Sequence, residues 1–487
     1  MTIPPFMRDR FYVVAGLVLA AWVGLSIAQE ELFVPLLVLG ICGLLLLNVT
    51  QPKPIPTLLL GVILVGYIAG NRGFAQLFLA PSVPLLPAEL VLLVGTLSLV
   101  ARSALHRQLP FRADAAGLVL LGWLLYGAVR LAVDFRSYRF EALRDSAMVY
   151  YAVFFYLARE AGQDPAARKF LRRCILTGCL LLLVLLYPFE QFPDFFLSIL
   201  TFRGVPIIFY KGDLVGIFLA VGAVLLYLKA EAERSWWPLA ASLAFAGATL
   251  LTNNRASMLG LAAATALLAL GGRWRFAAWQ AGAGAVAAVI VLFTAYVSEK
   301  PLEQTQLYGF YERVASIIDP AGQRQYLNEE SANKGDNNLF RFVWWQAVLD
   351  ETVAGNPYTG LGFGHDLAER FVREYYPDSG DEFTARSPHN IILTIFARMG
   401  AIGLLIFLGF IGLMATRTVR AIRGANPEIM GYWCSAWVIL VSACFGVVLE
   451  GPMGAVVFWT LLGLASAAEE PAAEEPLPLA EVHSGGV

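Results

Sequence analysis

The chain alternates between long apolar runs and short polar loops. A helix of about 20 apolar residues crosses a bilayer. Candidates for such helices occur at residues 11–28, 32–49, 57–70, 85–101, 115–133, 146–158, 174–189, 213–230, 237–251, 256–271, 276–297, 389–414, 430–449 and 452–467. Because some of these runs are short, the pattern predicts an all-α, polytopic transmembrane helical bundle of 12–14 spans.

A single long polar segment interrupts these runs. We predict about 11 spans in residues 1–297, a loop subdomain at 298–388, the last spans at 389–467 and a disordered tail at 468–487. The tail contains several Glu and Pro residues and no Lys or Arg, a composition that does not support a packed core.

Composition agrees with a membrane protein. Apolar residues make up 58% of the 487 residues and charged residues 15%, and the mean hydropathy is +0.64. A soluble multidomain protein of this length is far more polar. The first run follows two arginines and ends in Ser26-Ile27-Ala28, so a cleaved signal peptide is the alternative there. We favour an uncleaved span, because the loops then alternate consistently between the two sides of the membrane.

The basic residues are distributed unevenly between the loops. Alternate loops carry most of the Lys and Arg, as in residues 159–173 and 417–423. Because basic loops remain in the cytoplasm, both termini are predicted to be cytoplasmic. The polar segment at 298–388 then lies on the outer side of the membrane.

Cysteine and histidine indicate neither a disulfide framework nor a metal site. The five cysteines fall in apolar runs without a Cys-x-x-Cys pair, and the four histidines show no His-x-x-x-His spacing. The glycine-rich stretch at 356–365 lacks the Gly-Lys-[Ser/Thr] of a phosphate-binding loop. We therefore expect no metal and no cofactor.

The stretch at 386–403 carries candidate chemistry. Pro388, His389 and Asn390 stand immediately before a spanning run, which predicts a histidine at a membrane surface. The positive end of the helix dipole disfavours protonation there, and a neutral imidazole can accept a proton. In the alternative interpretation, His389 only caps the helix or belongs to an interfacial belt.

Several cations oppose the general charge bias by lying on the outer side. Arg203 and Lys211 lie between two runs, and Arg255 opens a third run after two Asn residues. Cations in this position can bind an anionic ligand, and a guanidinium can contact a phosphate through two hydrogen bonds. The alternative is that these side chains extend to lipid phosphates at the interface.

Two motifs in this order resemble the signatures of the O-antigen ligase family. Residues Arg255 to Leu259 fit R-x-x-x-L, and His389 to Gly403 fit H-[NSQ]-x9-G-x-x-[GTY]. The long polar segment before the histidine also resembles the larger group that includes O-antigen and exopolysaccharide polymerases and protein O-oligosaccharyltransferases.

The resemblance implies an inverting, metal-independent glycosyltransferase at the periplasmic face of the bacterial inner membrane. The implied donor is a glycan on undecaprenyl pyrophosphate, and the implied acceptor is lipid A-core for a ligase or a growing glycan for a polymerase. Membrane lipids are the other expected partners, and no nucleic acid is expected.

The same resemblance implies roles for individual residues. Arg255, Arg203 and Lys211 would bind the pyrophosphate, and His389 would activate the acceptor hydroxyl as a base. The remaining site candidates are expected to support the site or to contact the acceptor or the glycan, namely Asn390, Arg341, Arg313 and Arg386.

A flippase or transporter of lipid-linked glycans is the alternative outside the enzymes. Transporters concentrate charge near the bilayer midplane, whereas most of the notable cations here cluster at one surface. Arg398 departs from this, because it would lie about 13 Å deeper than His389 in a straight helix. We expect it to line the lipid cavity or to pair with Asp213 or Glu450.

The loop charges generate a topology prediction. A reporter fused after Ser466 should be cytoplasmic, and one inserted at Lys334 should be on the outer side, since basic loops stay inside. The activity of each reporter, which depends on the side of the membrane it occupies, measures both positions. If both report the same side, the span count and the assignment of the site to the outer face are wrong.

Overall fold

The structure is a computed structural model that describes residues 55–78, 86–106, 112–252, 254–319, 326–327, 329–375, 386–424 and 426–469. The predicted spans at 11–28 and 32–49, and nearly all of the predicted tail, lie outside these residues. Within them, the expected all-α polytopic architecture is confirmed.

The first half of the described chain is a series of helices joined by short connections. These are α3 (Ile55–Val65), which continues through the π-helix η1 (Gly66–Gly70) into α4 (Asn71–Ala75), then α5 (Pro87–His106), α6 (Ala115–Tyr138), α7 (Phe140–Asp145), α8 (Ala147–Tyr150), α9 (Val153–Gly162), α10 (Pro165–Gln191), α11 (Gly212–Glu233), α12 (Trp236–Leu251), α13 (Arg255–Leu270) and α14 (Arg275–Val297). The predicted run at 146–158 is split between α8 and α9.

The last part of the chain returns to the bundle as α18 (Ile391–Arg423), α19 (Pro427–Ala443) and α20 (Pro452–Ala468). By length and composition, 7 helical segments of the described residues can cross a membrane, and the apolar helices α12, α13 and α20 are shorter. The chain is thus a multi-pass membrane protein.

Helix α11 is the centre of the bundle. Every residue from Leu214 to Leu228 on this helix is buried, which is expected of a helix that is apolar on all sides. It packs against α10, α12, α13 and α19, while α9 packs along α20. The residues that open α11 and α13 are therefore brought to one end of the bundle.

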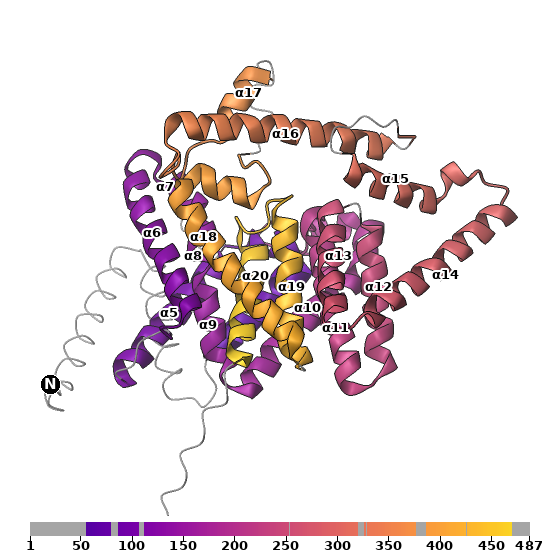
Figure 1. The fold of residues 1–487 in the computed structure, drawn as a ribbon, viewed down its shortest axis with the longest axis horizontal. Helices are drawn as coiled ribbons and strands as arrows, with labels where there is room; N and C mark the ends of the chain where they lie inside the picture. The colour runs from indigo at the N-terminus through magenta and orange to yellow at the C-terminus, as the bar shows by residue number, and fades with distance from the viewer. Residues whose placement is uncertain are drawn as a thin grey trace, which may run out of the picture.

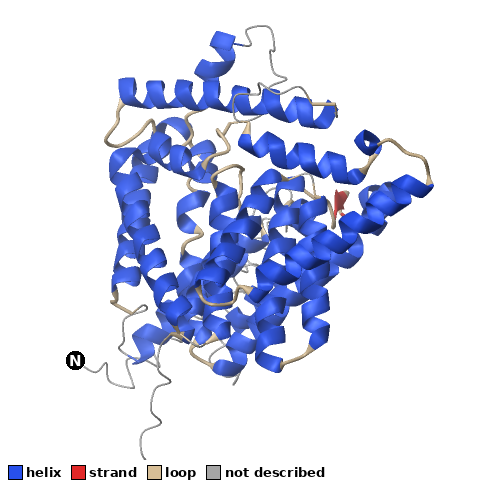
Figure 2. Ribbon diagram, turned by 45° about the vertical axis from the view of Figure 1, so that its right-hand side comes forward, coloured by secondary structure: helices blue, strands red, loops and turns tan. Residues whose placement is uncertain are grey.

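The polar segment covers that end. After the short 3₁₀ turn η3 (Leu302–Gln304) come α15 (Gln306–Ile318), α16 (Glu329–Gly355) and α17 (Glu369–Tyr375). Figure 1 shows α15 and α16 lying across the ends of the bundle helices, with α17 above α16. The same layer is visible in the rotated view of Figure 2.

Polar residues in the sequence determine where several helices begin. Asp114 caps α6, Asp164 caps α10 and Asn426 caps α19, each by accepting hydrogen bonds from backbone N–H groups of the first turn. Such caps stabilise a helix by about 1 kcal/mol. Two strands of two residues each, β1 (Thr201–Phe202) and β2 (Val205–Pro206), form a small hairpin after the π-helix η2 (Phe195–Ile199) in the α10–α11 connection.

Candidate functional site

His389 lies in the connection just before α18, outside the helix itself. Its φ of 57° is in the left-handed region, which few residues with a β-carbon adopt. Two tryptophans of α16 hold this connection. The Trp345 indole Nε1 donates to the carbonyl of Pro388 at 2.6 Å, and the Trp344 ring lies 6.0 Å from the His389 ring in an edge-to-face arrangement.

Asn390, not His389, caps α18. Its Oδ1 accepts from the backbone N–H groups of Ile392 at 3.1 Å and Leu393 at 3.2 Å. The alternative interpretation of His389 as the helix cap is therefore wrong. The side chain of Asn390 fixes the start of the helix, and the His389 side chain takes no part in this cap.

A cavity of about 780 Å³ opens at the same end of the bundle. Its polar lining includes Arg255 at the start of α13, Arg341 of α16 and Asp213 at the start of α11. Its apolar lining comes from α10 and α12, with Leu183, Leu186, Phe189, Ala248 and Leu251 among the residues. A ligand with both an anionic group and an apolar chain matches this combination.

Arg255 is positioned by its neighbour on the chain. The Oδ1 of Asn254 caps α13 through the N–H groups of Ala256 and Ser257, and its Nδ2 donates to the carbonyl of Asp213 at 2.6 Å. Arg255 Nη1 donates to the carbonyl of Ser316 at 3.2 Å and to its hydroxyl at 3.3 Å. The guanidinium thus joins α13 to α15 at the wall of the cavity.

Arg341 joins the polar layer to the bundle. Its Nη1 donates to the carbonyl of Phe445 at 3.0 Å, in the connection between α19 and α20. Burial, followed by the charge of Asp213, governs its pKa, and the net effect lowers this pKa from the usual value for arginine. Desolvating a guanidinium is costly unless an anion is present, so this position suits a bound anion.

Three charges act on His389. Burial lowers its pKa to about 4, the positive charges of Arg341 and Lys211 contribute in the same direction, and the negative charge of Asp213 opposes them. The imidazole is therefore neutral at physiological pH. A neutral imidazole beside cations can accept a proton from a hydroxyl group.

Lys211 belongs to the same cluster. Its Nζ lies 3.7 Å from Asp213 Oδ2 and donates to the carbonyl of Val447 at 3.4 Å. The structure therefore brings Lys211 and Arg341 close to His389, and Arg255 close to Arg341. Asp213 completes this group; the signal for it in the sequence is its place two residues after Lys211.

The other predicted site cations lie elsewhere. Arg203 is exposed at the turn of the β1–β2 hairpin, where its φ of 52° and that of Gly204 at 79° are typical of a tight hairpin turn. Arg313 donates to the carbonyls of Leu251 and Gly309, both at 3.2 Å. Neither arginine lines the cavity.

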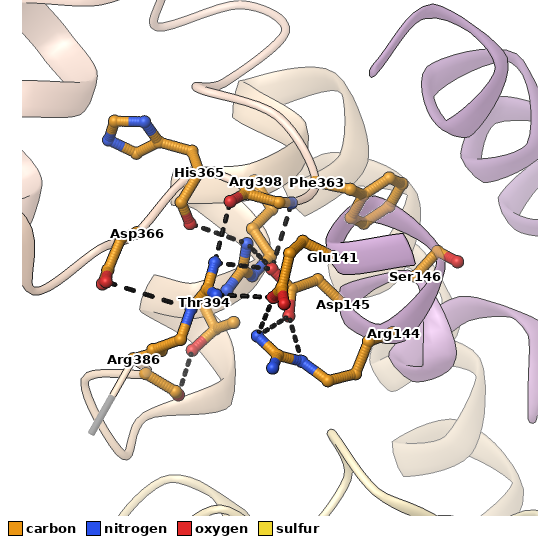
Figure 3. A network of polar contacts seen from close by, with 12 residues as sticks. Glu141, Arg144, Asp145, Ser146, Phe363, His365, Asp366, Arg386, Thr394 and Arg398 are labelled. Carbon is orange, nitrogen blue, oxygen red and sulfur yellow. Dashed lines mark hydrogen bonds and ion pairs between the residues drawn. The ribbon is translucent and has the colours of Figure 1, made fainter. Parts of the chain in front are cut away.

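Arg386 and Arg398 form a network of ion pairs with α7 (Figure 3). Arg386 Nη1 contacts Glu141 Oε2 at 2.5 Å, and Arg398 Nη1 contacts Asp145 Oδ2 at 2.7 Å. The expected ion pair of Arg398 with Asp213 or Glu450 is wrong, because Arg398 pairs with Asp145. Arg386, in the histidine connection, and Arg398, in the first part of α18, bind these segments to α7 rather than lining the cavity.

The comparison with known families agrees with this geometry. Residues 239–408 match the family described as O-antigen ligase. This match, over about a third of the chain, supports membership in the O-antigen ligase family. No curated protein matches the chain. Both signature segments, at Arg255 and at His389 to Gly403, lie inside the matched region, and the match supports an O-antigen ligase or polymerase type of glycan transfer.

The first glycine of the second family signature has a structural explanation. Gly400 interrupts α18 with φ 64° and ψ −167°, which are not helical values. The carbonyl of Tyr358 would lie only 2.2 Å from a β-carbon at this position. The freed N–H groups of Ala401 and Ile402 donate to the carbonyls of Pro357 and Tyr358 at 2.8 and 3.2 Å.

The expected straight helix at 389–414 is therefore wrong. The helix turns at Gly400 because a loop inserts its backbone there, and Figure 1 shows the first part of α18 lying across the bundle end before the helix descends. Arg398 precedes the turn. It stays among the polar groups of this end instead of lying about 13 Å deeper, as a straight helix would place it.

A first prediction concerns the turn in α18. Gly400→Ala should destabilise the protein by roughly 1–3 kcal/mol, because alanine is strained at this φ and ψ and its methyl group displaces the 357–361 loop. Thermal unfolding in detergent measures the effect. Gly409→Ala, on the same helix with no atom within 4 Å of the added carbon, is the matched control and should be neutral or slightly stabilising.

A second prediction concerns the ionisation of His389. At limiting donor concentration, kcat/KM reports the free enzyme, so it should stay flat at neutral pH and fall only near pH 4. Arg341→Gln removes a positive charge that lowers the pKa of His389, so the acid limb should move to higher pH. Initial rates of transfer measured from pH 3.5 to 8 test this. If the acid limb of the variant lies at the same pH as that of the wild type, the limb does not report the ionisation of His389.

Proposed function

We propose that this protein is an inverting glycosyltransferase that moves a glycan from undecaprenyl pyrophosphate to an acceptor hydroxyl at the periplasmic face of the inner membrane. We take the acceptor to be lipid A-core, which makes the protein an O-antigen ligase. The observation that carries this proposal is that Arg255 and Arg341 line one cavity and that the charge of Arg341 acts on a neutral His389.

The cavity supports the choice of donor. A polyprenyl pyrophosphate has two negative charges on a long apolar chain, and the cavity has arginines at one side and leucine and phenylalanine side chains of α10 at another. As the bond to the glycan breaks, negative charge grows on the leaving pyrophosphate. Fixed guanidinium groups stabilise such charge in the way that a metal does in other enzymes.

Arg203 and Lys211 remain part of the proposed donor site. The α10–α11 connection carries both of them. Residues at its two ends line the cavity, namely Glu190 near the end of α10, and Tyr210, Gly212 and Asp213 around the start of α11. The hairpin that presents Arg203 thus extends from the wall of the cavity. Its exposed position suits contact with the outer part of a long donor.

His389 supports the choice of reaction. In the proposed step, the acceptor hydroxyl attacks the anomeric carbon, its proton passes to the imidazole, and the pyrophosphate leaves with the electron pair of the broken C–O bond. A single attack from the face opposite the leaving group inverts the anomeric configuration. Asn390 fixes the start of α18 in this proposal, and Arg386 and Arg313 hold the surrounding connections.

A polymerase with the same chemistry is the second candidate, since the family match supports both types. The two differ in the acceptor alone. Incubation of the purified protein with a labelled lipid-linked glycan, EDTA and either lipid A-core or a second lipid-linked glycan distinguishes them. Transfer to neither acceptor, or transfer that requires a metal or nucleotide, would contradict the proposal.

The arginine pair generates a third prediction. Charge-assisted hydrogen bonds contribute roughly 1.5–3 kcal/mol each, so Arg255→Ala and Arg341→Ala should each slow transfer about ten- to a hundredfold. Arg255→Lys should restore part of the rate, because lysine keeps the charge but loses the bidentate geometry. Arg370→Ala removes a half-exposed arginine of α17 whose ion-pair partner among the described residues is Glu374, and it should leave the rate unchanged.

The base role has its own test. His389→Ala should reduce turnover by about 10²- to 10⁴-fold and should leave donor binding intact. His389→Asn should fold well, because asparagine tolerates the left-handed conformation that this position adopts. Transfer by the Asn variant at the wild-type rate would exclude His389 as the base.

A further inference from the structure

A second cavity, of about 580 Å³, lies at the other end of the bundle. It forms where the α11–α12 and α13–α14 connections meet, at the ends of α11 and α13 that are distant from Asp213 and Arg255. Its lining includes Arg234, Arg273 and Arg275 together with three tryptophans, Trp236, Trp274 and Trp279.

The charges in this cavity are only partly compensated. Arg273 Nε lies 2.9 Å from Glu231 Oε1, so these two charges are paired. Within the described part of the chain, neither Arg234 nor Arg275 forms an ion pair. Both are exposed, and Arg275 is close enough to Tyr227 for its charge to act on the phenol. The cavity therefore keeps two positive charges without a protein counter-charge.

The three tryptophan residues of this cavity are more than half exposed. Trp236 is 61% exposed, Trp274 62% and Trp279 51%. Tryptophan prefers the membrane interface, where the ring contacts acyl chains and the N–H reaches the headgroups. Three of them around two arginines mark this cavity as lying at headgroup level.

An apolar surface continues from the cavity along α14. On this helix only Phe276 and Ala295 are buried, and Figure 1 shows it slanting away from the other helices. Leu239 of α12 and Trp279 of α14 both line the cavity. A chain that enters the groove between these two helices would keep contact with apolar side chains after leaving the arginines.

We propose that this cavity binds an anionic glycerophospholipid, with its phosphate between Arg234 and Arg275 and one acyl chain between α12 and α14. Two charges on one side favour a lipid with net negative charge over a zwitterionic one. The site is separate from the proposed glycan-transfer cavity and does not depend on its chemistry.

Brominated lipids test this directly, because bromine quenches the fluorescence of tryptophan that it contacts. In mixed micelles, brominated phosphatidylglycerol should quench the wild-type protein at lower mole fraction than brominated phosphatidylcholine. Each arginine should contribute about a fivefold preference. Arg234→Gln with Arg275→Gln should therefore reduce the preference about 25-fold, while Arg234→Lys with Arg275→Lys should keep most of it.

Two controls make the result decisive. Arg423→Gln removes an exposed arginine at the same end of the bundle but outside the cavity, and it should keep the full preference. Inorganic phosphate at millimolar concentration should not compete, since the acyl chain contributes to binding. An unchanged preference in the double Gln variant, an equal loss in Arg423→Gln, or full competition by phosphate would each overturn the proposal.

Native mass spectrometry gives a second readout that does not depend on fluorescence. The wild-type protein should retain phosphatidylglycerol at collision energies that remove phosphatidylcholine, and the double Gln variant should lose both together. Circular dichroism confirms that the variant is folded. Retention of phosphatidylglycerol by a folded double Gln variant would again contradict the site.

Discussion

The insertion of a loop into a broken helix is the constraint on which the candidate site depends. Gly400 stops the hydrogen-bond ladder of α18, and the carbonyls of Pro357 and Tyr358 replace the lost partners. A backbone N–H that is buried in a membrane protein without a partner is too costly to persist. The break and the loop therefore require each other, and together they keep His389 and the first part of α18 at the end of the bundle.

The charged residues around this break divide into two groups. Arg398 with Asp145 and Arg386 with Glu141 are paired, and they tie the histidine connection to α7. Arg341 and Arg255 instead line the cavity, where Arg341 donates to a carbonyl and Arg255 to a carbonyl and a hydroxyl. Arg386 and Arg398 do not line it. This difference separates supporting residues from those proposed to bind the donor.

The two ends of the bundle also differ from each other. At the end covered by α16, Arg255 and Arg341 line a cavity with apolar walls, and a neutral histidine lies close enough to Arg341 to feel its charge. At the other end, arginines and exposed tryptophans line a second cavity. Both arrangements combine positive charge with apolar surface, but no histidine lines the second cavity. We therefore propose chemistry at one end and lipid binding at the other.

Sequence by itself determined the helical class, the positions of most described spans and the two segments that carry the family signatures. These follow from local properties, since apolar length, Asp and Asn caps and short motifs are written in contiguous residues. Only the tertiary structure decided that Arg341 joins Arg255 and that Arg398 pairs with Asp145. The physical reason is that both contacts join residues far apart in the chain. The turn of α18 has the same origin, because the helix turns at Gly400 only where a loop from another part of the chain satisfies its backbone.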